Sequence, residues 1–220
     1  MKRYLVFMSK KFPVILLLCF GLTSCVEIVE EVTIYSNNSG NIKYRIETSQ
    51  IASLINNLTG LLDVSSEKKV KEMARKYAVQ LESYNGIDSV RFNWNEKKSQ
   101  NILEFSFTGA DELNDAIYQL FGYKKNIFSP KYLKTKQHVF VRKNFSPWVK
   151  KYFESEKIEI PKEDFLEMIT YKTIIHYPKE VRRFKGSNIR LTNNGKQLVQ
   201  INNLKEILEN KADVGIRCRL

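Results

Sequence analysis

The chain has 220 residues, and its 36 Lys and Arg residues outnumber its 24 Asp and Glu residues, which gives a formal net charge of +12 at pH 7. This length suits one well-cored domain or two small ones, and no repeat or low-complexity segment interrupts it. Its two histidines have no ligand spacing and its three cysteines form no paired motif, so we expect no zinc or redox site and no cofactor.

The first residues follow the order of a secretion signal. An apolar run from Phe12 to Leu22 is followed by the small residues Thr23 and Ser24. The run holds about ten residues, whereas a helix needs about twenty to cross the hydrocarbon core, so a permanent membrane span is not expected. A buried core helix is the other interpretation, but the basic residues at the extreme N-terminus argue against it. These are Lys2, Arg3, Lys10 and Lys11.

The signal ends in Leu22-Thr23-Ser24-Cys25, which resembles the lipobox of bacterial lipoproteins: an apolar residue and two small residues before an obligatory cysteine. The resemblance implies that Cys25 carries diacylglycerol on its sulfur, that cleavage occurs before Cys25, and that the new amino group is often acylated. It divides the chain into a signal peptide, residues 1–24, and a single mature domain, residues 25–220. An ordinary cleaved signal with an incidental cysteine is the alternative.

The implied location is the cell envelope, with the protein anchored to a membrane through Cys25. Val26 follows the cysteine in place of the aspartate associated with inner-membrane retention, which favours the outer membrane if the cell has one. Cleavage would remove four basic residues and no acidic one, lowering the net charge from +12 to +8. Nucleic acid is not an expected partner of an exported protein. Anionic lipids, phosphorylated glycolipids, cell-wall carboxylates or an envelope protein are expected instead.

The mature chain is expected to open on a β-hairpin with its turn at residues 37–40. Pairing Ile34 with Ile42 keeps the apolar faces together and brings Glu31 opposite Arg45. Two helical patterns follow, an uncharged one over 49–62 and an amphipathic one over 70–84. The order of lipidated cysteine, glycine-turn hairpin and helices loosely resembles LppM-type lipoprotein domains, and this likeness covers little more than the hairpin.

The rest of the chain predicts further hairpins and helices. Strands are expected over 90–94 and 103–107, a helix from Asp111 to Gly122, and a strand from Ile169 to Tyr177. Asn194-Gly195 predicts a hairpin between 189 and 201, before a short helix and a terminal strand in which Cys218 alternates inward as a core thiol. The fold class is therefore α+β, an antiparallel sheet built of hairpins with several helices packed on one side.

One segment stands out by its charge, because no acidic residue occurs between Asp115 and Glu154. Aromatic residues interleave with its cations, a combination that suits an anionic membrane interface. The competing interpretation is a solvated basic face over a core made by the same aromatic rings. The candidate binding residues in this segment are Lys124, Lys125, Lys131, Lys134, Lys136, Arg142, Lys143, Lys150 and Lys151.

The sequence has no local catalytic motif, neither a nucleophile elbow nor a phosphate-cradling glycine loop. The leading hypothesis is a non-enzymatic, lipid-anchored envelope protein that binds an anionic or amphiphilic envelope component, or a protein partner. One alternative is an envelope hydrolase or transferase with a dispersed site, in which His138 or His176 would meet a carboxylate in a cleft. Another is a carrier that holds a lipid between the sheet and the uncharged 49–62 helix.

Overall fold

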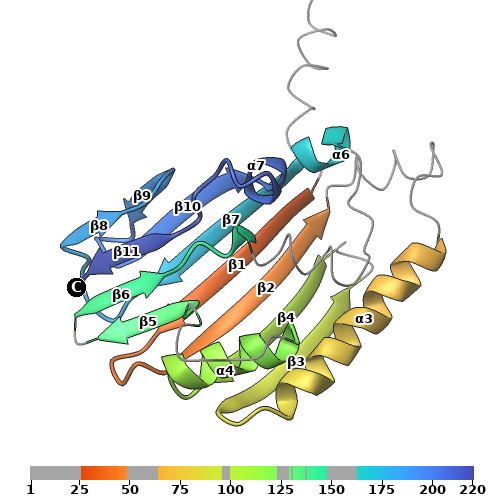
Figure 1. Ribbon diagram of the computed structural model, residues 1–220, viewed down its shortest axis with the longest axis horizontal. Helices are drawn as coiled ribbons and strands as arrows, with labels where there is room; N and C mark the ends of the chain where they lie inside the picture. The colour runs from red at the N-terminus through yellow and green to blue at the C-terminus, as the bar shows by residue number, and fades with distance from the viewer. Residues whose placement is uncertain are drawn as a thin grey trace, which may run out of the picture.

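The computed structural model describes residues 26–48, 64–95, 100–122, 129, 131–136, 138–147 and 163–220. Two sheets and a set of helices make up this part of the chain (Figure 1). The helices are α3 (Val64–Glu82), α4 (Ala110–Leu120), α6 (Glu163–Glu167) and α7 (Leu204–Leu208). None of the described helices is both long and apolar enough to span a bilayer.

The larger sheet has seven strands, with β1 at its centre. In spatial order they are β3 (Ile87–Asn95), β4 (Gln100–Phe107), β2 (Gly40–Thr48), β1 (Val26–Ile34), β7 (Ile169–His176), β10 (Gln197–Asn203) and β9 (Ile189–Thr192). Neighbouring strands are antiparallel except β1 and β7, which pair in parallel because the chain between them crosses back to the same end. The α+β class predicted from the sequence is confirmed, with this one parallel pair added.

A second sheet of four strands covers part of one face of the first. Its spatial order is β5 (Leu133–Lys136), β6 (Val139–Arg142), β11 (Ile216–Arg219) and β8 (Arg183–Lys185). Figure 1 shows this sheet and the helices on the same side of the larger sheet, as expected for the helices. Side chains from both sheets, α3 and α4 meet in one core, which includes Val32, Leu81, Leu113, Phe140 and Cys218.

The first hairpin forms as predicted, but its register differs from the prediction by two residues. Val32, not Ile34, lies opposite Ile42, and Ile34 lies opposite Gly40. The physical reason is Gly40, which has no side chain and lets the Phe107 ring from β4 pack over the backbone. The turn is therefore confined to residues 35–39, and Asn38 takes the left-handed conformation there, with φ of 66°.

Most of the other elements lie where the sequence places them. The amphipathic helix is α3, the helix beginning near Asp111 is α4, and both Asn194 and Gly195 have the positive φ of a tight hairpin turn. Cys218 is 2% exposed, which confirms it as a core thiol. The uncharged helix expected over 49–62 lies outside the described residues, and so does Cys25.

Candidate functional site

The four-stranded sheet has one apolar side and one cationic side. Strand alternation turns Leu133, Phe140 and Cys218 into the core and leaves the intervening residues facing outward. Six of the outward side chains on β5, β11 and β8 are basic and exposed. We call this set the cationic face: Lys134, Lys136, Arg183, Lys185, Arg217 and Arg219.

The strand register arranges the cationic face in two rows that run across the sheet. In each row a valine of β6 lies between a lysine of β5 and two cations of β11 and β8. Adjacent strands are about 4.8 Å apart, and the two rows, two residues apart along each strand, are separated by about 6.7 Å. The rows are Lys134, Val141, Arg217 and Lys185, and then Lys136, Val139, Arg219 and Arg183.

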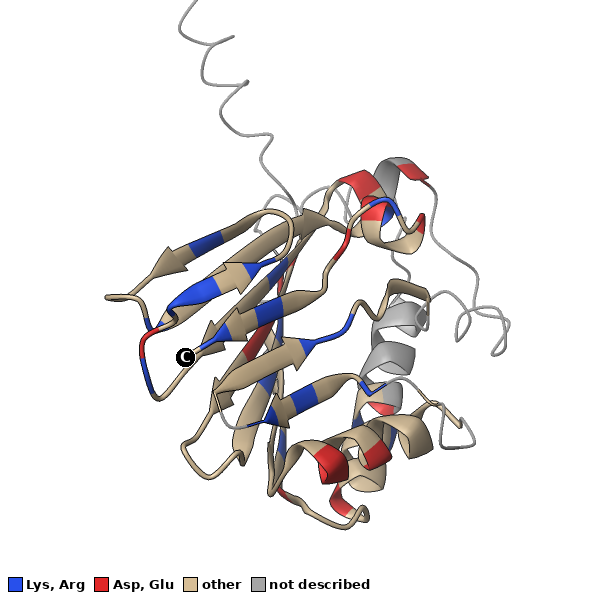
Figure 2. Ribbon diagram, turned by 60° about the vertical axis from the view of Figure 1, so that its left-hand side comes forward, with Lys and Arg blue, Asp and Glu red and all other residues tan. Residues whose placement is uncertain are grey.

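No acidic residue occurs in any of the four strands, and Figure 2 shows basic residues along them. The acidic residue nearest to β8 in the chain is Glu180, which precedes the strand by three residues. Within the described part of the chain, none of the six cations forms an ion pair with an acidic side chain. Arg217 is directly opposite Lys185, and Arg219 is directly opposite Arg183. Like charges in such positions destabilise a sheet, so an external anion would relieve an existing repulsion.

The opposite side of the larger sheet shows how this fold otherwise arranges charge. There the register places Lys43 between Glu31 and Glu104 on the two neighbouring strands. Lys172 Nζ lies 3.5 Å from a Glu27 carboxylate oxygen. Cations on that side therefore alternate with acids, whereas those of the cationic face do not.

The predicted basic segment is divided by the structure. Lys134 and Lys136 belong to the cationic face, and Lys143 is exposed directly after β6. Lys131 forms an ion pair with Asp111 of α4. The remaining lysines of the segment, Lys124, Lys125, Lys150 and Lys151, lie outside the described residues.

Arg142 corrects the prediction, because its side chain is 1% exposed and cannot belong to a surface binding site. It forms an ion pair with Glu30 of β1, which is equally buried. Its Nη1 donates to the Val214 carbonyl oxygen at 2.6 Å, and its Nε donates to the Tyr132 hydroxyl at 3.2 Å. Burial alone would lower the pKa of Arg142, but the Glu30 carboxylate raises it well above its usual value. Arg142 therefore joins the two sheets as a permanent cation.

The aromatic side chains described from the same segment are also core residues. Tyr132 and Phe140 are buried, and Phe145 is half-buried with its ring centroid 4.8 Å from the Arg142 guanidinium carbon. For these three rings the structure agrees with the second interpretation of the segment, a basic surface over an aromatic core. The aromatic residues at 123, 128, 148, 152 and 153 lie outside the described residues.

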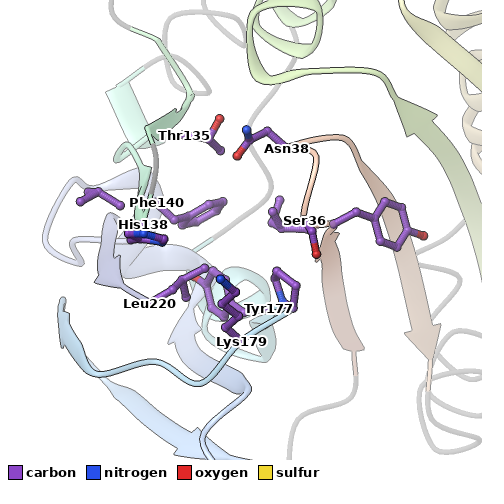
Figure 3. Close-up of a pocket in the computed structure, with 12 residues that line it drawn as sticks. Ser36, Asn38, Thr135, His138, Phe140, Tyr177, Lys179 and Leu220 are labelled. Atoms are coloured by element: carbon purple, nitrogen blue, oxygen red, sulfur yellow. The ribbon is translucent and has the colours of Figure 1, made fainter.

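A small hollow lies beside the cationic face, between the turns of two hairpins and the chain after β7 (Figure 3). It measures about 120 Å³, and its lining includes Ser36, Thr135, His138 and Lys179. The alternative of a hydrolase or transferase with a dispersed site requires a histidine close to a carboxylate in a cleft. His176 Nε2 lies 2.9 Å from Glu31 Oε1, but on the far side of the larger sheet and outside this hollow. His138 lines the hollow, and no carboxylate side chain lines it. His138 also lines a neighbouring, more open hollow of about 410 Å³ together with Glu180. Within the described part of the chain, no hydrogen bond or ion pair joins these two side chains.

Comparison with solved structures adds a structural likeness. No protein-family model matches the chain, and no curated protein matches it. Among solved structures, the NMR structure of the folded domain of LppM from Mycobacterium tuberculosis is similar, with a TM-score of 0.39 and 6% sequence identity over 89% of each chain.

Sequence reasoning missed four members of the cationic face, Arg183, Lys185, Arg217 and Arg219. They lie 29 or more residues after Glu154, where the basic segment ends, and join Lys134 and Lys136 only through sheet pairing. One local signal was available. In the terminal strand, Ile216 and Cys218 alternate with Arg217 and Arg219, a pattern that predicts one apolar and one cationic side.

Proposed function

We propose that this protein is a lipid-anchored component of the bacterial cell envelope, attached through Cys25, and that its cationic face binds an anionic envelope component. It acts by binding rather than by catalysis. The observation that carries the binding role is the pair of cationic rows without acidic partners. Clustered cations without internal counter-charges attract anions over a distance of about one Debye length, roughly 8 Å at physiological salt.

The anchoring role rests on the lipobox and on the position of β1. Val26 is the first residue of this central strand, so a lipid on Cys25 would be attached to the folded domain without a flexible tether. The outer membrane is the proposed location if the cell has one. Intact-mass measurement of the membrane-extracted protein tests the anchor. Loss of residues 1–24 with gain of diacylglycerol is expected, and Cys25→Ser should abolish both. An unmodified Cys25 in the mature protein would contradict the proposal.

The binding role is tested with the full chain reconstituted in phosphatidylcholine vesicles. The probes are labelled vesicles containing phosphatidylglycerol and labelled inorganic polyphosphate. Each near-surface cation contributes about 1 kcal/mol toward an anionic surface, so the double variant Arg217→Glu/Arg219→Glu should bind the anionic probe at least about 30-fold more weakly.

The matched control is Arg75→Glu/Lys76→Glu, which reverses two exposed cations on α3 and changes the net charge by the same amount. This control should retain binding to within about threefold, because screening limits the reach of a distant charge. Equal losses of affinity in the two variants would mean that only the net charge matters, and would overturn the role of the cationic face. Absence of binding to either probe by the unmodified protein would overturn it as well.

A further inference from the structure

The cationic face has a denser half, formed by β11 and β8. Arg217 lies opposite Lys185 and Arg219 lies opposite Arg183, so four cations form a two-by-two block, which we call the arginine block. The other half is less dense, because Val141 and Val139 separate the lysines of β5 from β11. In antiparallel sheets the Cβ atoms of opposite residues are about 5 Å apart, so the basic groups within each pair can contact one anion together.

The composition of the arginine block favours one anion chemistry. Three of its four residues are arginines, whose planar guanidinium presents donors as a rigid fork that matches phosphate and carboxylate oxygens. A carboxylate has only two oxygens, both in one plane, and one fork engages both of them. A phosphate group directs its oxygens tetrahedrally and can accept from two forks on opposite sides. Arg219 and Arg183 are placed to supply two such forks.

The spacing of the block suits a ligand that carries more than one phosphate. The two opposite pairs are two residues apart along the strands, about 6.7 Å, so each pair can hold a separate phosphate of an extended chain. The block has no acidic residue in its own strands that could occupy these positions instead.

The position of the block favours a polymer over the headgroups next to the anchor. Arg142 of β6 contacts Glu30, and Val139 of β6 lines the same hollow as Ile34. Since Val141 and Val139 pair with Arg217 and Arg219, the block lies at the level of residues 31–34 of β1. Val26 is five to eight residues away along that strand, roughly 17–27 Å, so the block and the anchored end of β1 are well separated.

Resting on the proposed function, we infer that the arginine block recognises the repeated phosphate groups of an anionic envelope polymer. Recognition depends on guanidinium geometry as well as on charge. Lysine in place of arginine keeps the charge but removes the fork, so the two contributions can be separated.

The experiment compares the unmodified full chain with the triple variant Arg183→Lys/Arg217→Lys/Arg219→Lys, both in a non-ionic detergent. The soluble probes are inorganic polyphosphate and polyglutamate of equal charge, and vesicles containing phosphatidylglycerol form a third arm. The unmodified chain should prefer polyphosphate, and the triple variant should lose about tenfold in affinity for it because the bidentate contacts are gone. Affinity for polyglutamate should change less than about twofold, since the charge is unchanged. Equal melting temperatures check that both proteins are folded.

Unchanged polyphosphate binding by the triple variant would overturn this inference. If Arg217→Glu/Arg219→Glu still weakened binding in that case, the proposed function would stand without it. Equal affinity of the unmodified chain for polyphosphate and polyglutamate would also overturn the inference. Binding to the vesicles but not to polyphosphate would identify lipid headgroups as the phosphate source and would overturn the polymer as ligand.

Discussion

Glu30 of β1 and Arg142 of β6 form an ion pair between the two sheets, and each side chain is 1% exposed. The carboxylate also accepts hydrogen bonds from the Tyr132 hydroxyl and, at 3.1 Å, from the Thr173 hydroxyl. A buried charge that loses its partner is costly, because neither water nor another ion can replace that partner.

Truncating one member of this pair should therefore destabilise the fold strongly. Arg142→Met leaves the Glu30 carboxylate buried without its partner and should lower the free energy of unfolding by about 3–5 kcal/mol, measured by urea denaturation. The double variant Glu30→Leu/Arg142→Met should lose less than Arg142→Met alone, because no unpaired charge remains.

The exposed ion pair between Lys131 and Asp111 provides the control, since its side chains are 43% and 68% exposed. Lys131→Ala should lower the free energy of unfolding by less than about 1 kcal/mol. If Arg142→Met cost no more than Lys131→Ala, the buried pair would not join the two sheets as described.

Gly40 should tolerate no side chain, even though it lies in an ordinary strand. A Cβ there would overlap the Thr33 carbonyl oxygen and lie 2.5 Å from Cζ of Phe107. Gly40→Ala should lower the free energy of unfolding by at least about 1–3 kcal/mol, the usual cost of overpacking. Phe107→Leu in the same chain should not restore stability, because the carbonyl clash remains. A neutral Gly40→Ala in thermal or urea unfolding would contradict the explanation of the hairpin register.

The buried thiol of Cys218 predicts a loss of stability at alkaline pH. Burial raises its pKa to about 11 from an ordinary value of 9.0, so the folded chain holds this proton more tightly than the unfolded chain does. The resulting stability is intact below pH 9 and is lost as the pH rises toward 11.

Urea denaturation should therefore show a free energy of unfolding that falls from pH 8 to pH 11. Ionisation of Cys218 contributes about 2 kcal/mol to this decrease. Cys218→Ala should have a shallower slope, although its stability at pH 8 is lower because a cavity replaces the sulfur. If the free energy of unfolding fell equally with pH in both proteins, the raised pKa of the buried Cys218 thiol would be contradicted. Buried tyrosines with raised pKa values, including Tyr132, add to the slope near the upper end of this range in either protein.

The sequence predicts elements whose signals are local. The Asn194-Gly195 turn, the helix α4 near Asp111 and the inward alternation of Cys218 each depend on a few neighbouring residues. The predicted register of the first hairpin is wrong because the observed register depends on Phe107, which is more than sixty residues from Gly40 in the chain.

The candidate site shows the same division between local and distant signals. Lys134 and Lys136 were found from composition, but no local pattern distinguishes them from Arg142, whose acidic partner Glu30 is 112 residues away in the chain. Likewise, β8 has only three residues, too few for a recognisable alternation, and its pairing with β11 brings two cations into the face.

Because Arg219 and Arg183 repel each other, removing one of these charges should stabilise the fold and weaken anion binding. Arg183→Gln removes one of two like charges on opposite strands and should raise the free energy of unfolding of the ligand-free protein by about 0.2–1 kcal/mol. The same variant should bind polyphosphate more weakly. Thermal unfolding with and without polyphosphate checks both effects at once. A variant that is less stable, or that binds as tightly as the unmodified protein, would contradict this relationship.

The central claim is that the cationic face holds an anionic component in the intact envelope. The most direct test places a photo-crosslinking amino acid at Val141, the half-buried centre of one cationic row, in the full chain in living cells labelled with radioactive phosphate. Ile174, half-buried on the opposite side of the larger sheet, is the control position. Phosphate-labelled adducts at position 141 and none at position 174 are the predicted result. Equal labelling at both positions, or none at position 141, would contradict the claim.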